Sequence, residues 1–141
     1  LVFLKKSNRF GGIKSKLKAT MNTQGTIQLT RACTDEYFSD GSFVFGRLAV
    51  AEDDSTKEAL TTFYLVEETN KEAIEKDVDV IKLTIDKSAQ TRKFNFSDLL
   101  PRFTKQFEKL EEGKKLIYFD VAKKEIEGYK VLEFTAEVVE N

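Results

Sequence analysis

Lysine occupies every second position in one segment near the start of the chain. Lys14, Lys16 and Lys18 are separated by Ser15 and Leu17. In a β-strand, side chains two residues apart point to the same side and the chain rises about 3.3 Å per residue, so the three ammonium groups would form a row at roughly the spacing of nucleic-acid phosphates. The same pattern is typical of a solvated edge strand, where lysine prevents edge-to-edge pairing.

A second segment has the same basic character. Residues 81–97 contain four basic side chains and one acidic side chain, a net charge of +3. Two matched basic segments favour contacts with DNA phosphates, and the amide side chains of Asn22, Gln24 and Gln90 are suited to hydrogen bonds with base edges. The predicted nucleic-acid-binding residues are Lys14, Lys16, Lys18, Gln24, Arg31, Lys82, Lys87, Arg92 and Lys93.

The composition excludes several kinds of catalysis and metal binding. The chain of 141 residues has no histidine and a single cysteine, Cys33. It therefore has no intrachain disulfide, no thiolate zinc site and no Ser-His or Cys-His pair. The carboxylates near Asp40 do not match a calcium loop, and those between Glu72 and Asp79 lack a recognisable catalytic frame. We predict a non-enzymatic protein with no catalytic residue, no metal site and no cofactor.

Charge is distributed unevenly along the chain. Residues 1–34 contain seven basic and no acidic side chains, whereas residues 35–141 carry a net charge of −8. A flexible basic arm, residues 1–12, is suited to a polyanion, and its Arg9-Phe10-Gly11-Gly12 sequence combines a cation, an aromatic ring and flexible backbone. The Gly-Gly pair also fits a plain linker before the first strand.

Alternation and turn residues predict a β-rich first half, residues 13–67. Apolar residues alternate from Ile13 to Met21 and again over 26–30, with turn residues between them, which predicts a hairpin. Thr30 is suited to cap a short helix that ends near Phe38. The other elements expected before the second half are strands at 43–50 and 60–66 and, in the connector 68–80, one helical turn near 71–76.

The second half, residues 81–141, repeats this order. The elements expected in it are a hairpin over 81–96, a helix that Ser97 or Asp98 caps and Gly113 ends, and a hairpin with its turn at 125–128. The predicted fold class is therefore α+β and β-rich, with two pseudo-repeated ββαββ units packed around one core. The side chains expected in this shared core are Ile27, Leu29, Phe94 and Phe96.

Residues 17–50 resemble a known family of DNA-binding proteins. The segment contains a strand, then Gly25-Thr26-Ile27-Gln28-Leu29-Thr30-Arg31, a small helix, and Gly41 before the next strand. This order is similar to that of AbrB-type transition-state regulators and MazE-type antitoxins. In these families two such units interlock as a swapped-hairpin barrel. Thr30 stands where the family usually has proline.

A second segment, residues 82–121, resembles a degenerate copy of the same unit. Phe94, Phe96 and Gly113 fit the pattern, although no glycine matches Gly25. The resemblance implies a swapped-hairpin, barrel-like fold whose hairpins bind DNA through basic residues. The positions that would face DNA by this resemblance are Lys16, Lys18 and Arg31.

These features lead to two hypotheses about function. The first is a non-catalytic DNA-binding protein, a transcriptional regulator, that contacts phosphates through its basic hairpins. The alternative is a structural or protein-interaction module of a phage or mobile element that docks through its N-terminal arm, as a homo-oligomer or in a larger assembly. No small-molecule substrate is identified. The longest apolar runs are only a few residues, which predicts a cytoplasmic protein without a membrane span.

Overall fold

The computed structural model describes residues 17–51, 59–86, 91–110 and 112–137. The expected arm and the side chains of Lys14, Lys16 and Lys87 lie outside these residues. The elements are β1 (Lys18–Met21), β2 (Thr26–Leu29), α1 (Arg31–Phe38), β3 (Phe45–Ala49), β4 (Thr62–Glu67), α2 (Lys71–Lys76), β5 (Ile81–Lys82), β6 (Thr84–Asp86), β7 (Thr91–Asn95), the 3-10 helix η3 (Ser97–Phe103), α3 (Thr104–Glu108), β8 (Ile117–Ile126) and β9 (Tyr129–Ala136).

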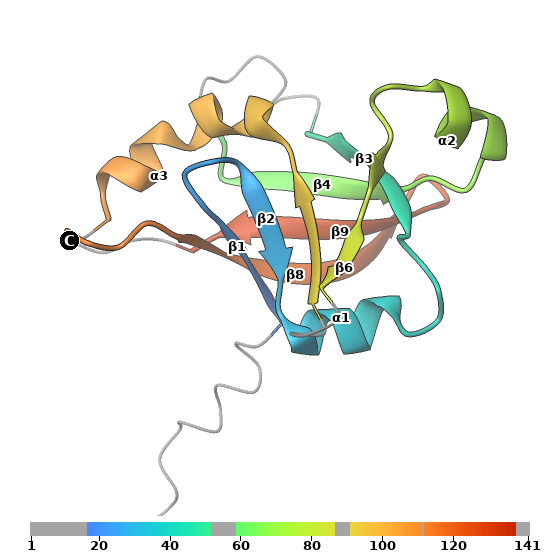
Figure 1. Ribbon diagram of the computed structural model, residues 1–141, viewed down its shortest axis with the longest axis horizontal. Coiled ribbons are helices and arrows are strands. Elements are labelled where there is room, and N and C mark those ends of the chain that lie inside the picture. The colour runs from blue at the N-terminus through green and yellow to red at the C-terminus, as the bar shows by residue number, and fades with distance from the viewer. Residues whose placement is uncertain (1–16, 52–58, 87–90, 111, 138–141) are drawn as a thin grey trace, which may run out of the picture.

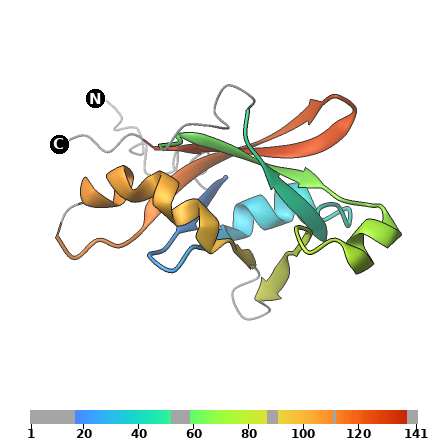
Figure 2. The same cartoon turned by 90° about the horizontal axis from the view of Figure 1, so that it is seen from above.

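All the described strands join one antiparallel sheet that nearly closes into a barrel. The strand order is β5-β3-β4-β9-β8-β1-β2-β7-β6. The first and last strands of this order, β5 and β6, are separated in the sequence only by Leu83, whose N–H donates to the carbonyl of Val44 at 3.0 Å. Figure 1 shows α1 at one end of the barrel and η3 with α3 at the other, and Figure 2 gives the view from above. The β-rich prediction is confirmed.

The first hairpin forms as its sequence predicts. In β1 and β2 every second residue is buried, and Ala19 is paired with Leu29. The Asn22 side chain organises the turn, because its Oδ1 accepts from the backbone N–H groups of Gln24 at 2.9 Å and Thr26 at 3.0 Å. A side-chain carbonyl that replaces backbone acceptors in this way is typical of asparagine in turns.

Of the two helix caps expected from the sequence, one forms and the other does not. Thr30 caps α1, since its Oγ1 accepts from the Cys33 N–H at 3.3 Å. The expected cap at Ser97 or Asp98 is wrong: Phe96 precedes η3 and no side chain caps it. The residue before η3 is held by the first hairpin turn, because the Phe96 N–H donates to the Gly25 carbonyl at 3.0 Å.

Two predicted elements are divided in the structure. The alternating segment 81–85 separates at Leu83 into β5, which pairs with β3, and β6, which pairs with β7. Because of this break, one short stretch of chain forms the strands at both ends of the strand order. The helix expected to run to Gly113 is a 3-10 helix followed by α3, with Pro101 inside the first part. Proline lacks an N–H donor and clashes with the preceding turn of a regular α-helix.

One hydrophobic core contains side chains from both halves of the chain. The predicted core residues Ile27, Leu29 and Phe94 are buried, and Phe96 is half-buried against them. At the centre lies a phenylalanine cluster, defined as Phe63, Phe103, Phe119 and Phe134. Because the two halves share this core, they do not fold around separate interiors. No helix in the described ranges is long and apolar enough to cross a membrane.

The half-buried position of Phe96 gives a first stability prediction. Replacing a fully buried phenylalanine with alanine costs about 3–5 kcal/mol, so Phe96→Ala should lower the free energy of unfolding by about 2 kcal/mol. Urea denaturation of the two proteins measures the difference. A loss below about 1 kcal/mol would mean that the ring is solvated and adds nothing to the core.

Candidate nucleic-acid interface

The two segments that the sequence marks as basic lie side by side. Strand β2 of the first hairpin pairs with β7 of the second, with Gln28 opposite Lys93. The four strands β1, β2, β7 and β6 therefore form one continuous surface, which Figure 1 shows at the front of the molecule. We call its outer side the hairpin face.

A row of polar side chains crosses the hairpin face. Direct pairing aligns Thr20 with Gln28, Gln28 with Lys93, and Lys93 with Thr84. These residues alternate with the buried core positions of the same strands, so they point outward. Strand β8 extends the row with Tyr118, which pairs with Thr20 and is 47% exposed.

Hydrogen bonds hold the amide side chains of this face in place. Gln28 donates from Nε2 to Thr91 Oγ1 at 2.9 Å. Asn95 donates from Nδ2 to the Gln24 carbonyl at 3.1 Å and to Thr26 Oγ1 at 3.2 Å. Fixed amides and hydroxyls lose little side-chain entropy when a ligand binds, which favours polar recognition here.

Two of the predicted lysines have different surroundings on this face. Lys93 is exposed at the centre of the row. The Lys18 ammonium lies 3.7 Å from Asp120 and is also paired with Glu137, and its side chain is only 20% exposed. Because two carboxylates neutralise it, the Lys18 ammonium is less available to a further anion than that of Lys93.

Arg92 points toward the interior rather than toward the hairpin face. Its Nη1 donates to the Leu83 carbonyl at 3.3 Å, and its guanidinium carbon lies 5.4 Å from the centre of the Phe38 ring. Burial lowers the pKa of this guanidinium from its usual value. Arg92 thus attaches α1 to the barrel, where the cation–π contact stabilises it.

The remaining predicted residues lie at separate places. Gln24 is exposed in the turn at one end of the hairpin face, and Lys82 is exposed on β5 beside β3. Arg31 begins α1, with Nε 4.0 Å from Asp35. Among the predicted residues that the structure describes, Lys18, Gln24 and Lys93 are therefore brought to one surface, and Arg31, Lys82 and Arg92 are not.

Sequence reasoning missed several polar residues of the hairpin face. The residues added by the structure are Thr20, Thr26, Gln28, Thr84, Asn95 and Tyr118. Period-two alternation alone identifies Gln28 and Thr20 as outward-facing, but it does not reveal that β1 pairs with β8 or β2 with β7. Only those long-range pairings place Tyr118 beside the row.

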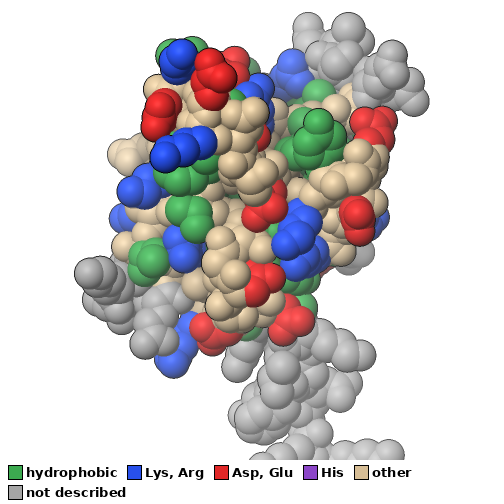
Figure 3. Space-filling view, turned by 90° about the vertical axis from the view of Figure 1, so that its right-hand side faces the viewer, with side chains coloured by type: hydrophobic (Ala, Val, Ile, Leu, Met, Phe, Trp, Pro, Cys, Tyr) green, Lys and Arg blue, Asp and Glu red, His purple; other side chains and the backbone are tan. Residues whose placement is uncertain are grey.

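Figure 3 views the side that carries α2, where acidic and basic side chains are interspersed. No group of three metal-ligating side chains occurs among the residues that the structure places.

Cys33 is buried, and desolvation raises the pKa of its thiol to about 11, which leaves it an unreactive core residue at neutral pH.

Comparison with protein-family models, curated proteins and solved structures finds no match for this chain. The interpretation of the hairpin face therefore rests on its residues and their geometry.

Proposed function

We propose that the protein is a non-catalytic DNA-binding protein that contacts DNA with its hairpin face. The pairing of β2 with β7 is the observation that carries this proposal, since it joins both basic hairpins into one surface. The resemblance of residues 17–50 to swapped-hairpin regulators supports the same function, because those families bind DNA through their hairpins.

The residues of the face suit different parts of a nucleic acid. The Lys93 ammonium is available to a phosphate, and the half-exposed Tyr118 ring offers a surface on which a base stacks. Between them, the amide of Gln28 and the hydroxyls of Thr20 and Thr84 supply donors and acceptors for sugar, phosphate or base edges. One cation and one ring, separated on the same face by polar residues, favour an unpaired strand over a rigid duplex.

We also propose that residues 13–67 and 81–141 are two related ββαββ units. Two pairings support this relation: β2 pairs with β7, and β4 pairs with β9. Each joins strands that occupy the same place in the two halves, and each is antiparallel, as an approximate two-fold axis requires. The pairing of β1 with β8 has its counterpart in that of β5 with β3.

Titration with mixed-sequence single-stranded and duplex oligonucleotides at two salt concentrations tests the DNA proposal. Lys93→Gln should reduce the slope of log affinity against log salt by about 0.7 for single strands, because one phosphate contact is lost. Tyr118→Ala should weaken single-strand binding by about 1–3 kcal/mol through the loss of one stacked base. Fluorescence anisotropy measures both effects.

Two control variants test whether these effects are specific to the hairpin face or follow from the loss of any exposed lysine or tyrosine. Lys71→Gln removes an exposed lysine on α2, and Tyr129→Ala removes an exposed tyrosine on β9. Neither change should alter binding or its salt dependence. Equal effects of the control and test variants would contradict the proposal that the hairpin face contacts DNA. An absence of salt-sensitive binding would favour the alternative function, a protein-interaction module.

A further inference from the structure

A pocket of about 350 Å³ lies on the outer side of the sheet where the β8–β9 hairpin turns. This size is typical of small-ligand sites. Its lining comes from the end of β3 and the two residues that follow it, from β4 and from the hairpin end, and it is apolar except for two tyrosines and one carboxylate. The residues that determine its chemistry are Tyr64, Val66, Ile126, Glu127, Tyr129 and Val131.

Strand pairing gives the pocket an apolar floor and a partly open wall. Val66 of β4 is paired directly with Val131 of β9, and Val131 is only 2% exposed although it lies on the outer side of the sheet. Ile126 and Tyr129 face each other across the hairpin end and are 40% and 58% exposed. A ligand that entered would cover these two exposed side chains.

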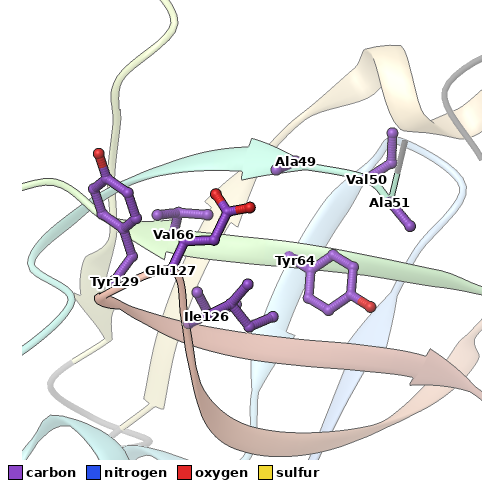
Figure 4. Close-up of a pocket in the computed structure, with 9 residues that line it drawn as sticks. Ala49, Val50, Ala51, Tyr64, Val66, Ile126, Glu127 and Tyr129 are labelled. Carbon is purple, nitrogen blue, oxygen red and sulfur yellow. The ribbon is translucent and has the colours of Figure 1, made fainter. Parts of the chain in front are cut away.

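Glu127 occupies an unusual position at the edge of this pocket. It has φ 54°, in the left-handed region, and is followed by Gly128 with φ 85°. Such a two-residue hairpin turn favours asparagine or glycine, so glutamate is a costly choice at its first position. Figure 4 shows the Glu127 side chain extending over Val66, with Tyr129 on one side and Tyr64 on the other.

Among the residues that the structure describes, none compensates the charge of Glu127. Within the described ranges its carboxylate has neither a hydrogen bond nor an ion pair. Two described cations that pair with pocket residues across the strands are engaged elsewhere: Lys124 lies 3.0 Å from Glu133, and Arg47 is paired with Glu68 at 2.8 Å and Asp77 at 2.9 Å. A ligand that covers the pocket would partly desolvate this carboxylate, which is unfavourable unless the ligand supplies positive charge.

We propose that this pocket binds a small organic amine as an alkylammonium cation. The ammonium group pairs with the Glu127 carboxylate beside the Tyr129 ring, whose face attracts cations, and the Tyr64 ring lines the other side of the pocket. The alkyl chain covers Val66 and Val131 and replaces water there. An anion would be repelled by Glu127, and a neutral apolar molecule would leave the carboxylate without a partner. This site is separate from the hairpin face and does not depend on DNA binding.

Three probes with the same carbon chain test the proposal on the intact protein at constant ionic strength. They are n-butylammonium, n-butanol and butyrate, and NMR chemical shifts report binding residue by residue. We expect n-butylammonium to bind about tenfold more tightly than n-butanol, from one ion pair and the ring contacts, and butyrate to show no binding. The shifts should be confined to Tyr64, Ile126, Tyr129 and their neighbours in the pocket.

Variants of the hairpin identify the group responsible for this preference. Glu127→Gln and Glu127→Asn both remove the charge, and asparagine also suits the turn, so both should abolish the preference for butylammonium over butanol. Glu125→Gln removes a neighbouring exposed carboxylate that does not line the pocket and should preserve the preference.

Several results would overturn the proposal. These are equal affinities for n-butylammonium and n-butanol, an unchanged preference in Glu127→Gln, or an equal loss in Glu125→Gln. A lysine-containing tripeptide that bound more tightly than n-butylammonium would assign the pocket to the side chain of a partner protein instead of a free amine. A failure of DNA binding would leave the amine result unaffected.

Discussion

Replacing Phe63 with alanine should lower the free energy of unfolding by about 4–5 kcal/mol. The Phe63 ring is fully buried and stacks on Phe134, with ring centres 4.7 Å apart and planes inclined by 13°. It also makes edge contacts with Phe119 at 5.4 Å and Phe103 at 6.0 Å. Alanine would leave a cavity among rings that belong to two strands, β8 and β9, and to η3, and these elements have little freedom to close it.

The measurement is chemical denaturation, with thermal unfolding as a second method. For a domain of this size the loss corresponds to a decrease in Tm of roughly 10–15 °C. Tyr129→Ala is the matched control, because it also removes an aromatic ring but from a side chain that is 58% exposed. It should cost less than about 1 kcal/mol. A similar loss in both variants would contradict the central role of the phenylalanine cluster.

The local structure of the first half could be predicted because its signals are local. The hairpin of β1 and β2 follows from period-two alternation on both sides of a turn, and Thr30 caps α1 through a contact three residues away. The last hairpin was likewise expected from Gly128 and the alternation of β9. Each of these features depends on neighbours that the sequence itself places together.

The closure of the sheet could not be predicted in the same way. The break at Leu83, which lets β5 and β6 pair at opposite ends of the strand order, carries no local signal, because Leu83 fits the alternation of an unbroken strand. The start of η3 likewise depends on a residue far away in the sequence. The Gly25 carbonyl accepts from the Phe96 N–H, directly before this helix.

At the candidate sites, too, the sequence indicates the type of a residue and its place on a strand, but not which distant residues it contacts. The sequence correctly identified Lys18 as an outward-facing residue of its strand, but its carboxylate partners, Asp120 and Glu137, come from the other half of the chain. Arg92 was expected among the exposed basic residues, whereas its alternation with Lys93 turns it toward Phe38. The amine pocket depends on the meeting of β4 with β9, for which the sequence contained no signal.

Gly25→Ala should be the second most damaging single change, with a loss of about 3 kcal/mol. Gly25 has φ +82°, a conformation that costs an L side chain about 1–2 kcal/mol. A Cβ at this position would lie 2.8 Å from the Ser97 Cα and 3.1 Å from the Ser97 nitrogen. Both atoms belong to the backbone, so the crowding can be relieved only by moving the start of η3 away from the turn.

A matched glycine separates the two contributions. Gly113 also has positive φ, +87°, but a Cβ there would meet nothing within 4 Å. Gly113→Ala should therefore show the conformational cost alone, about 1–2 kcal/mol, and the additional loss in Gly25→Ala measures the contact between the turn and η3. Denaturation of both variants under the same conditions gives this difference. Equal losses would contradict a close approach at Gly25.

The substitution Gly25→Ala also tests whether the contact between the turn and η3 affects the hairpin face. Asn95 donates to the Gln24 carbonyl, so a displaced turn would release one of the amides that the face holds in place. If the hairpin face binds DNA, Gly25→Ala should weaken binding in the folded protein without changing the salt slope, because Lys93 is untouched. Unchanged affinity in folded Gly25→Ala would show that this end of the face does not contact DNA.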